Sequence, residues 1–253
     1  MRKTKIICTL GPSTDSPEIL EAMMKSGMDV ARFNFSHGTH EDHKRRLEML
    51  KDLRKKLNIP VAALLDTKGP EIRLKTFEKG EVYLETGQHF TLTAREVTGT
   101  REICSVTYKN LAQDVRLGSQ VMLDDGLISM KVVEKTETDV ICRVENGGAV
   151  KDRKGVNVPG VHLSMPYMSA QDRADIRFGI EEGFDFIAAS FCRTAQDAME
   201  IRRMLDENHS NMRIIAKLEN QEGVNNVDEI LAVVDGVMIA RGDMGVEIDF
   251  TEI

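Results

Sequence analysis

The residues best suited to chemistry are a lysine, a glutamate and an aspartate: Lys217, Glu219 and Asp243. Lys217 and Glu219 lie two apart in the run RIIAKLEN, which predicts a strand, and alternate side chains of a strand share one face. Asp243 follows a second apolar run, 236–240, which predicts the next buried parallel strand and brings a second carboxylate to the same edge. Two carboxylates beside a lysine suit a divalent metal ion and an anionic substrate.

A second polar row lies in the segment ARFNFS. Arg32, Asn34 and Ser36 occupy one face of the predicted strand, while Phe33 and Phe35 occupy the other. Aromatic side chains buried against helices would leave the polar row at the mouth of a site. A single such residue would be explained as the cap of a neighbouring loop, and for the three together both explanations stay open.

The third strand ends in polar residues as well. LLDTKGPEIR places Asp66 and Thr67 at its end, followed by Glu71 and Arg73. Oxygen ligands for a hard cation could come from four residues: Asn34, Ser36, Asp66 and Thr67. The planar guanidinium of Arg73 could bind phosphate through two hydrogen bonds.

Three histidines and a lysine are weaker signals. The spacing of His37, His40 and His43 invites a metal site, but His40 and His43 are expected to begin a solvated helix, and no thiolate supports them. His37, in the preceding loop, is the better candidate for ligand contact. Lys154 lies in a turn-rich segment where a lysine is usually only solvated, although a role in a lid is also open.

Composition places the chain among globular proteins. Its 253 residues are 41% apolar, and the formal charge of −7 comes from mixed-sign segments, which gives no basic footprint for nucleic acid or an anionic membrane. The four cysteines, at 8, 104, 142 and 192, do not approach Cys-x-x-Cys spacing. No run reaches transmembrane length, so we expect a cytoplasmic protein without a membrane partner.

The pattern of elements predicts an α/β fold. The first third alternates strands and helices, with a long helix from about His40 to Leu57. From 74 to 168, short runs of alternating polarity between turn residues predict an inserted all-β domain. Helix and strand then alternate again, so we expect a barrel domain at 1–73, a lid at 74–168 and the second part of the barrel at 169–253.

Counting these units favours an incomplete (β/α)8 barrel. A closed barrel takes about 250 residues, whereas roughly 158 remain outside the insertion, enough for about six βα units. An open doubly wound sheet is the alternative, but the dinucleotide-binding fingerprint G-x-G-x-x-G and the phosphate-binding loop of nucleotide hydrolases are absent.

With these residues assembled, the chain closely resembles the pyruvate kinase family, of the bacterial type. The resemblance runs from Lys3 to the last residue through a set of motifs that is specific only in combination: TKIICTLGPST, ARFNFSHG, LLDTKGPEIR, LDDGLISM, ENGG, KGVNVPG, FIAASF, AKLENQEG and ARGDMGVE. It implies a barrel with a mobile β-rich lid inserted after the third strand. The implied activity is phosphoryl transfer between phosphoenolpyruvate and ADP, giving pyruvate and ATP, in a homo-oligomer that is typically a tetramer.

The resemblance also implies roles for individual residues. Glu219 and Asp243 resemble the ligands of a catalytic Mg²⁺ or Mn²⁺, Lys217 the group that neutralises the transferring phosphoryl and the enolate, and Arg32 the arginine on the phosphate. The K⁺ ligands of the family are matched by Asn34, Ser36, Asp66 and Thr67, and Glu71 matches the glutamate of K⁺-dependent members. Nucleotide contacts are matched by Asn34, His37, Arg73 and Lys154. The backbone N–H groups of Gly242 and Asp243 resemble the cradle for the substrate carboxylate.

The family continues past this point with two more barrel strands and a C-terminal domain that holds the allosteric effector site. We therefore expect this chain to be a fragment with little activity alone. Two other functions stay open: a naturally short, non-catalytic relative that binds phosphoenolpyruvate, nucleotide or a partner, and another metal-dependent barrel, such as an aldolase. The aldolase alternative leaves the inserted domain and ARFNFSHG unexplained.

Overall fold

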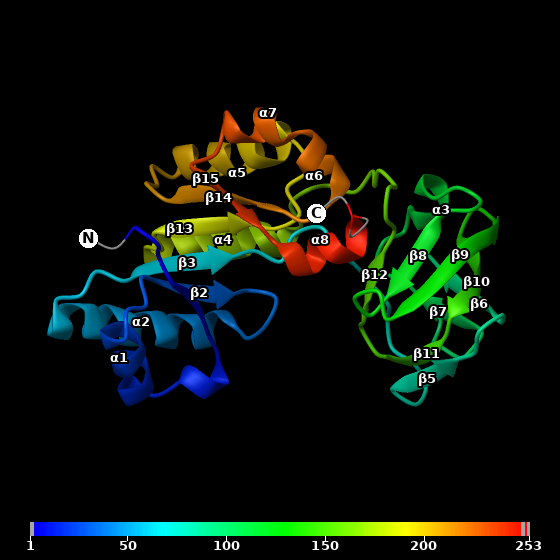
Figure 1. Ribbon diagram of the computed structural model, residues 1–253, viewed down its shortest axis with the longest axis horizontal. Coiled ribbons are helices and arrows are strands. Elements are labelled where there is room, and N and C mark those ends of the chain that lie inside the picture. The colour runs from blue at the N-terminus through cyan, green and yellow to red at the C-terminus, as the bar shows by residue number, and fades with distance from the viewer. Residues whose placement is uncertain (1–2, 249–250, 252–253) are drawn as a thin grey trace. The chain divides into compact units, whose positions relative to one another are not determined.

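A computed structural model describes residues 3–248 and residue 251, which form two compact units (Figure 1). The first unit holds the residues up to Gly69 together with Tyr167–Leu218 and Asn226–Met238. The second holds Pro70–Pro166, Glu219–Asn225 and the residues from Ile239 onward. The domain boundaries expected from the sequence stay a prediction.

The first unit is built on a six-stranded sheet in the order β1-β2-β3-β13-β14-β15. The strands are β1 (Ile7–Leu10), β2 (Val30–Asn34), β3 (Ala62–Asp66), β13 (Phe186–Ala189), β14 (Arg213–Leu218) and β15 (Gly236–Ile239). The pairs from β1 to β14 are parallel. Because the spatial order follows the chain order, the doubly wound alternative, in which the order reverses at the centre, is excluded. The prediction of an α/β fold with an incomplete barrel of about six βα units is confirmed.

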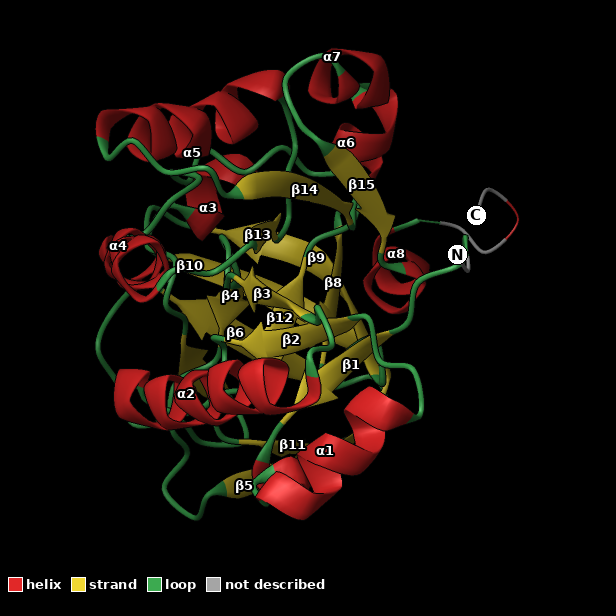
Figure 2. Ribbon diagram, turned by 90° about the vertical axis from the view of Figure 1, so that its left-hand side faces the viewer, coloured by secondary structure: helices red, strands yellow, loops and turns green. Residues whose placement is uncertain are grey.

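The helices of this unit follow the outer side of the curved sheet (Figure 2). They are α1 (Pro17–Lys25), α2 (His40–Leu57), α4 (Ala170–Glu182), α5 (Ala195–Glu207) and α7 (Val227–Leu231), with a short 3₁₀ helix at Pro12–Thr14. The longest, α2, is capped by Thr39, whose side chain accepts a hydrogen bond from the Asp42 backbone N–H while the Asp42 carboxylate accepts one from the Thr39 backbone N–H. This capping box satisfies N–H groups that the first turn leaves open.

Apolar side chains at helical spacing hold α2 against the sheet. Leu47, Leu50 and Leu53 are buried on its inner face. They share one core with strand residues such as Phe33, which is fully buried and contacts Phe184 edge-to-face with ring centroids 5.1 Å apart. Burial of this stripe, rather than the helix propensity of a highly charged sequence, is what stabilises α2.

The second unit is a β-rich body. Its seven-stranded sheet has the order β4-β12-β8-β9-β10-β6-β7, and β11 pairs with β5 separately. The strands are β4 (Ile72–Arg73), β5 (Glu81–Leu84), β6 (His89–Thr93), β7 (Ile103–Ser105), β8 (Gln120–Leu123), β9 (Ile128–Lys135), β10 (Asp139–Asn146), β11 (Gly148–Lys151) and β12 (Gly155–Asn157). Its helices are α3 (Leu111–Asp114), α6 (Gln221–Asn225) and α8 (Arg241–Glu247).

Alternating polarity explains the fold of this second body. On β9, Ile128, Met130 and Val132 are buried, whereas the residues between them are more exposed. The antiparallel partner β10 repeats the pattern with Val140, Cys142 and Val144. One face of this sheet therefore closes a core of its own.

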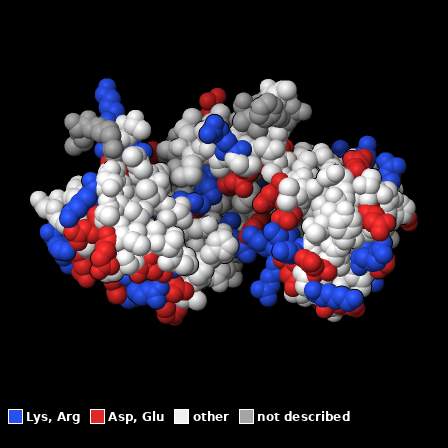
Figure 3. Space-filling view, turned by 60° about the horizontal axis from the view of Figure 1, so that its bottom comes forward, with Lys and Arg blue, Asp and Glu red and all other residues white. Residues whose placement is uncertain are grey.

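No helix in the described part of the chain combines the length and apolar character that crossing a membrane requires. On the face shown in Figure 3, Lys and Arg side chains lie interspersed with Asp and Glu side chains. This mixed surface agrees with the absence of single-sign blocks in the sequence.

Candidate active site

Polar side chains of the first unit gather where neighbouring parallel strands end. Arg32 lies on β2, Asp66 is the last residue of β3, Ser190 follows β13, and Lys217 lies near the end of β14. The carboxyl ends of parallel strands are the usual place for the active site of a barrel. The strand order thus brings together residues that are far apart in the sequence.

Asp66 is the centre of this cluster. It is 1% exposed, and its Oδ2 accepts a hydrogen bond from Arg32 Nε at 2.6 Å and pairs with the Arg32 Nη2. Its Oδ1 lies 3.1 Å from both Lys217 Nζ and Ser190 Oγ. Two cations and one carboxylate leave a net charge of +1 on these three side chains, which favours an anionic ligand.

The oxygens expected to hold a monovalent cation lie on the same strand ends. Asn34 and Asp66 are directly paired in the β2–β3 ladder. The Asn34 Oδ1 accepts a hydrogen bond from the Ser36 backbone at 3.0 Å, and Thr67 Oγ1 donates to the Ala188 carbonyl at 3.2 Å. Asparagine, serine, threonine and carboxylate oxygens are suitable ligands for a hard cation, and Asp66 would share its charge between that ion and the two basic side chains.

Glu219 and Asp243 belong to the second unit. Glu219 immediately follows β14 and is 1% exposed, whereas Asp243 is exposed in the first turn of α8. Among the described residues, no group of three or more His, Cys, Asp or Glu side chains is placed to hold a metal. A site with two carboxylates, as expected from the sequence, falls below that number.

Helix α8 is held by the β-rich body. Asn157 Nδ2 on β12 donates to Glu247 Oε1 at 2.6 Å, and Glu247 lies one helical turn after Asp243. Burial raises the pKa of Glu247, and the nearby charge of Asp243 raises it further. The contact fixes the end of the helix whose first turn carries Asp243.

The expected nucleotide contacts are distributed over both units. In the second unit, Arg73 pairs with Glu71 at 2.7 Å and donates to the Arg153 carbonyl at 2.9 Å, while Lys154 pairs with Asp124 at 2.8 Å. His37 lies in the first unit and is exposed. The structure therefore does not bring these residues together within one unit.

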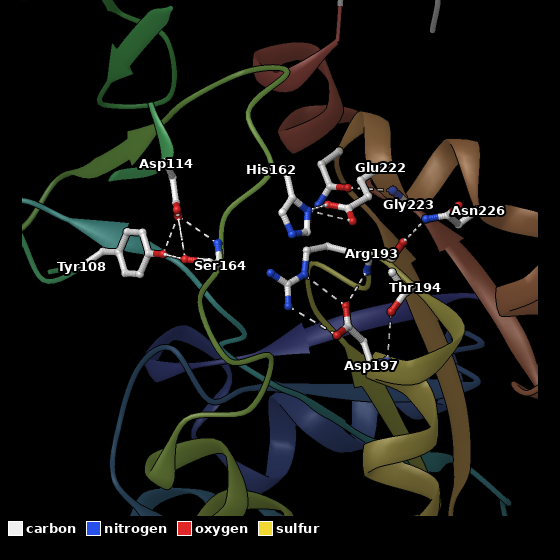
Figure 4. A network of polar contacts seen from close by, with 11 residues as sticks. Tyr108, Asp114, His162, Ser164, Arg193, Thr194, Asp197, Glu222, Gly223 and Asn226 are labelled. Carbon is white, nitrogen blue, oxygen red and sulfur yellow. Dashed lines mark hydrogen bonds and ion pairs between the residues drawn. The ribbon is translucent and has the colours of Figure 1, made fainter. Parts of the chain in front are cut away.

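Two further polar networks lie outside the candidate residues (Figure 4). In the second unit, Tyr108 Oη donates to Asp114 at 2.5 Å, and the Ser164 backbone donates to the same carboxylate at 2.8 Å. These bonds tie the segment after β12 to α3. In the first unit, Arg193 pairs with Asp197 at 3.1 Å, and its backbone N–H donates to the same carboxylate at 3.0 Å, just before α5, whose N-cap is Thr194.

The expectation that His40 and His43 begin a solvated helix is wrong for His43. Its imidazole is 3% exposed and stacks on Phe35 with ring centroids 4.1 Å apart, and its Nε2 bonds to the His37 carbonyl at 2.9 Å. His40 stacks on Phe178 and lies 2.6 Å from Asp175 through its Nε2. The first turn of α2 packs against the core, and this packing explains the histidine spacing without a metal.

Burial of His43 gives a testable pH dependence. Desolvation lowers the pKa of His43, so the folded protein binds fewer protons there than the unfolded chain below pH about 6.5. Stability from this group is complete above that pH and is lost as the pH falls toward the lowered folded pKa. We expect His43→Gln to remove up to about 2 kcal/mol of the difference in unfolding free energy between pH 7 and pH 5.

Urea denaturation at a series of pH values measures this effect. His89→Gln is the control, because it makes the same substitution at an exposed position on β6. Parallel pH profiles for wild type and His43→Gln would contradict the prediction.

Sequence reasoning missed Ser190. It contacts Asp66 and Lys217 directly, yet in the sequence it is one serine after an apolar run. The available signal was its position immediately after a predicted barrel strand, the position that Asp66 and Thr67 share.

Comparison with known proteins identifies the family of the chain. The family model described as "Pyruvate kinase, barrel domain" matches residues 1–253. Pyruvate kinases of Staphylococcus aureus (strain MRSA252) and Staphylococcus epidermidis (strain RP62A) are each 51% identical to the chain over 250 residues. Those alignments cover 98% of this chain but 43% of each relative.

The chain thus spans less than half the length of these relatives, and its similarity extends over both units described above. The family match covers the strand ends that carry Arg32, Asp66 and Lys217. This chain belongs to the pyruvate kinase family.

Proposed function

We propose that the protein carrying this chain transfers the phosphoryl group of phosphoenolpyruvate to ADP, giving pyruvate and ATP. The observation that carries the proposal is the cluster of the half-buried Arg32 with the buried Asp66 and Lys217, whose net positive charge lies at the carboxyl ends of barrel strands. Phosphoryl transfer asks mainly for positioning and for positive charge around the phosphoryl oxygens.

In this reaction the bond between phosphorus and the enol oxygen breaks, and a bond forms between phosphorus and a terminal phosphate oxygen of ADP. The enolate that leaves takes up a proton and becomes pyruvate. Arg32 would bind the phosphate, and Lys217 would neutralise charge on the phosphoryl group and on the enolate oxygen. The backbone N–H groups of Gly242 and Asp243 would bind the substrate carboxylate.

The donor atoms suit the cations that this chemistry uses. Glu219 and Asp243 offer carboxylate oxygens, the ligands that Mg²⁺ and Mn²⁺ prefer, and the bound ion supplies positive charge to the transferring group. The K⁺ ligands in this proposal are Asn34, Ser36, Asp66 and Thr67, with Glu71 nearby in the sequence. The nucleotide would contact Asn34, His37, Arg73 and Lys154. The proposal includes a cytoplasmic homo-oligomer, with phosphoenolpyruvate, pyruvate, ADP and ATP as its small-molecule partners.

A coupled assay tests the function. We expect the full-length protein that carries these residues to form pyruvate, detected by lactate dehydrogenase and NADH oxidation, only with phosphoenolpyruvate, ADP, Mg²⁺ and K⁺ together. Omitting ADP separates phosphoryl transfer from simple hydrolysis. Tight binding of phosphoenolpyruvate in calorimetry without turnover would instead indicate a non-catalytic binding protein.

A further inference from the structure

Ser190 lies beside Asp66 in the strand-end cluster and has no role in the proposed reaction. It follows β13, is 2% exposed, and lies between the end of β3 and the end of β14. A buried hydroxyl at such a position must satisfy its own hydrogen bonds, and these bonds show what it holds in place.

The Ser190 hydroxyl has three polar partners. Lys217 Nζ donates to its Oγ at 2.8 Å. The Oγ lies 2.6 Å from the Thr67 carbonyl oxygen and 3.1 Å from Asp66 Oδ1. A serine hydroxyl carries one proton, so it can donate to only one of these two oxygens at a time. The shorter distance indicates that the Ser190 hydroxyl donates to the Thr67 carbonyl oxygen, and rotation about the Cβ–Oγ bond would direct the same proton toward Asp66.

The backbone around Ser190 is fixed from several sides. Its N–H donates to Thr67 Oγ1 at 3.1 Å, and Tyr167 Oη donates to its carbonyl oxygen at 3.2 Å. A Cβ atom added at Gly69 would lie 2.8 Å from that carbonyl oxygen, so the loop after β3 passes in close contact. The hydroxyl is therefore held at a defined place relative to Thr67 rather than left to adjust.

We propose that Ser190 is a positioning residue that links the K⁺ ligands to Lys217, an inference that rests on the proposed function. Thr67 and Asp66 are among the oxygens proposed to hold K⁺, and Lys217 is the cation proposed to meet the phosphoryl group. One hydroxyl contacts all three. Removing the hydroxyl would change the position of the Lys217 ammonium group. It would also free the lone pairs of the Thr67 carbonyl and Asp66 oxygens that the hydroxyl now contacts.

The alternative is that Ser190 only joins β3 to β13. That structural role predicts a loss of stability in Ser190→Ala, with substrate kinetics and the response to K⁺ unchanged. The linking role predicts that both change.

The experiment uses the full-length protein with Ser190→Ala and Ser190→Cys. We expect Ser190→Ala to lower kcat by about 10- to 100-fold, the effect of losing one hydrogen bond to a charged group, with KM for phosphoenolpyruvate changed less than about threefold. The K⁺ concentration for half-maximal activity should rise at least about threefold by the same reasoning. Ser190→Cys keeps the volume but offers a weak donor, so it should fold normally and show most of the same loss.

A second readout needs no turnover. Tm is measured without substrate in KCl and in tetramethylammonium chloride at equal ionic strength. The increase in Tm that K⁺ gives should be smaller in both variants than in wild type. The matched control is Ser105→Ala, because Ser105 is also fully buried and its hydroxyl also lies within hydrogen-bond distance of two backbone carbonyl oxygens, but in the β-rich unit.

Wild-type values of kcat and of the K⁺ response in Ser190→Ala, with a Tm loss like that of Ser105→Ala, would overturn the proposal. So would full activity in Ser190→Cys. A wild-type protein that forms no pyruvate would refute the proposed function instead, and the K⁺-dependent Tm shift would still test whether Ser190 supports the cation oxygens.

Discussion

Replacing Lys217 with methionine in the full-length protein is expected to lower kcat for pyruvate formation by about 10³-fold or more. Lys217 is 8% exposed, and its ammonium is already held by Ser190 Oγ at 2.8 Å and Asp66 Oδ1 at 3.1 Å. A charge fixed in a partly water-excluded site stabilises developing negative charge without first having to reorganise. Methionine keeps most of the volume but removes the charge and the hydrogen-bond donors of the ammonium group.

The kinetic constants separate two functions of the lysine. If Lys217 acts mainly on the transition state, kcat falls while KM for phosphoenolpyruvate changes little. If it only binds the ground-state phosphate, KM rises and kcat is kept. We expect the first pattern, because Arg32 already supplies a cation at the other oxygen of Asp66.

Two control variants test whether the effect comes from the charge at position 217. Lys217→Arg keeps the charge but enlarges the head group in a buried place, so it should recover only part of the lost activity. Lys44→Met removes an exposed lysine of α2 that pairs with Glu182 at 2.6 Å, and it should leave kcat unchanged. A Lys217→Met protein within tenfold of wild type would assign this lysine to structure alone.

The fold could be predicted from the sequence where one pattern dominates. Strict alternation identified β2, and the prediction that Phe33 and Phe35 face the core is confirmed. Helix α2 begins at His40 and ends at Leu57, as expected, because a threonine cap and a leucine stripe define it. The sheet order could be expected because successive βα units of one hand place each strand beside the last.

Prediction failed where the local pattern hides the deciding contact or the element is too short to show a period. The burial of His43 depends on stacking with Phe35 across a loop, and the residues around it are charged enough to indicate a solvated helix. Helix α6, at Gln221–Asn225, was not expected, because its five residues are too few to show a period.

In the candidate site, too, some residues could be predicted from the sequence and others could not. Charged residues at strand ends indicated Arg32, Asp66 and Lys217, because charged side chains are rarely buried without a partner, and Asp66 and Lys217 are indeed buried. Ser190 carries no charge, and its contact with Asp66 spans 124 residues, so only the folded sheet reveals it. The roles of all these residues remain predictions until variants are measured.

The largest effect on stability is expected from Asp66→Asn. The carboxylate is 1% exposed and contacts Arg32, Lys217 and Ser190. Asparagine has nearly the same shape, but it leaves two cations without a counter-charge and offers an N–H₂ group where an acceptor is needed. Breaking a buried ion pair from one side costs about 3–5 kcal/mol, and we expect roughly 3 because the Arg32 side chain is partly exposed.

This cost is measured by a double-mutant cycle. It takes the urea denaturation of wild type, Asp66→Asn, Arg32→Met and the double variant. The double variant should be more stable than the sum of the single losses predicts, since removing Arg32 takes away one of the stranded cations. Asp185→Asn is the matched control, because Asp185 also pairs with an arginine, Arg54 at 2.9 Å, but its side chain is 43% exposed. It should lose about 1 kcal/mol or less from that ion pair.

Asp66→Asn should also change how strongly the protein binds an anion. With the carboxylate gone, the Arg32 and Lys217 pair carries a charge of +2 instead of a net +1, so inorganic phosphate should raise the Tm of the variant more than that of wild type. If phosphate stabilises both proteins equally, the two cations do not face a common anion site. In that case the loss of stability in Asp66→Asn would reflect packing, and the buried cluster would no longer support phosphoryl transfer.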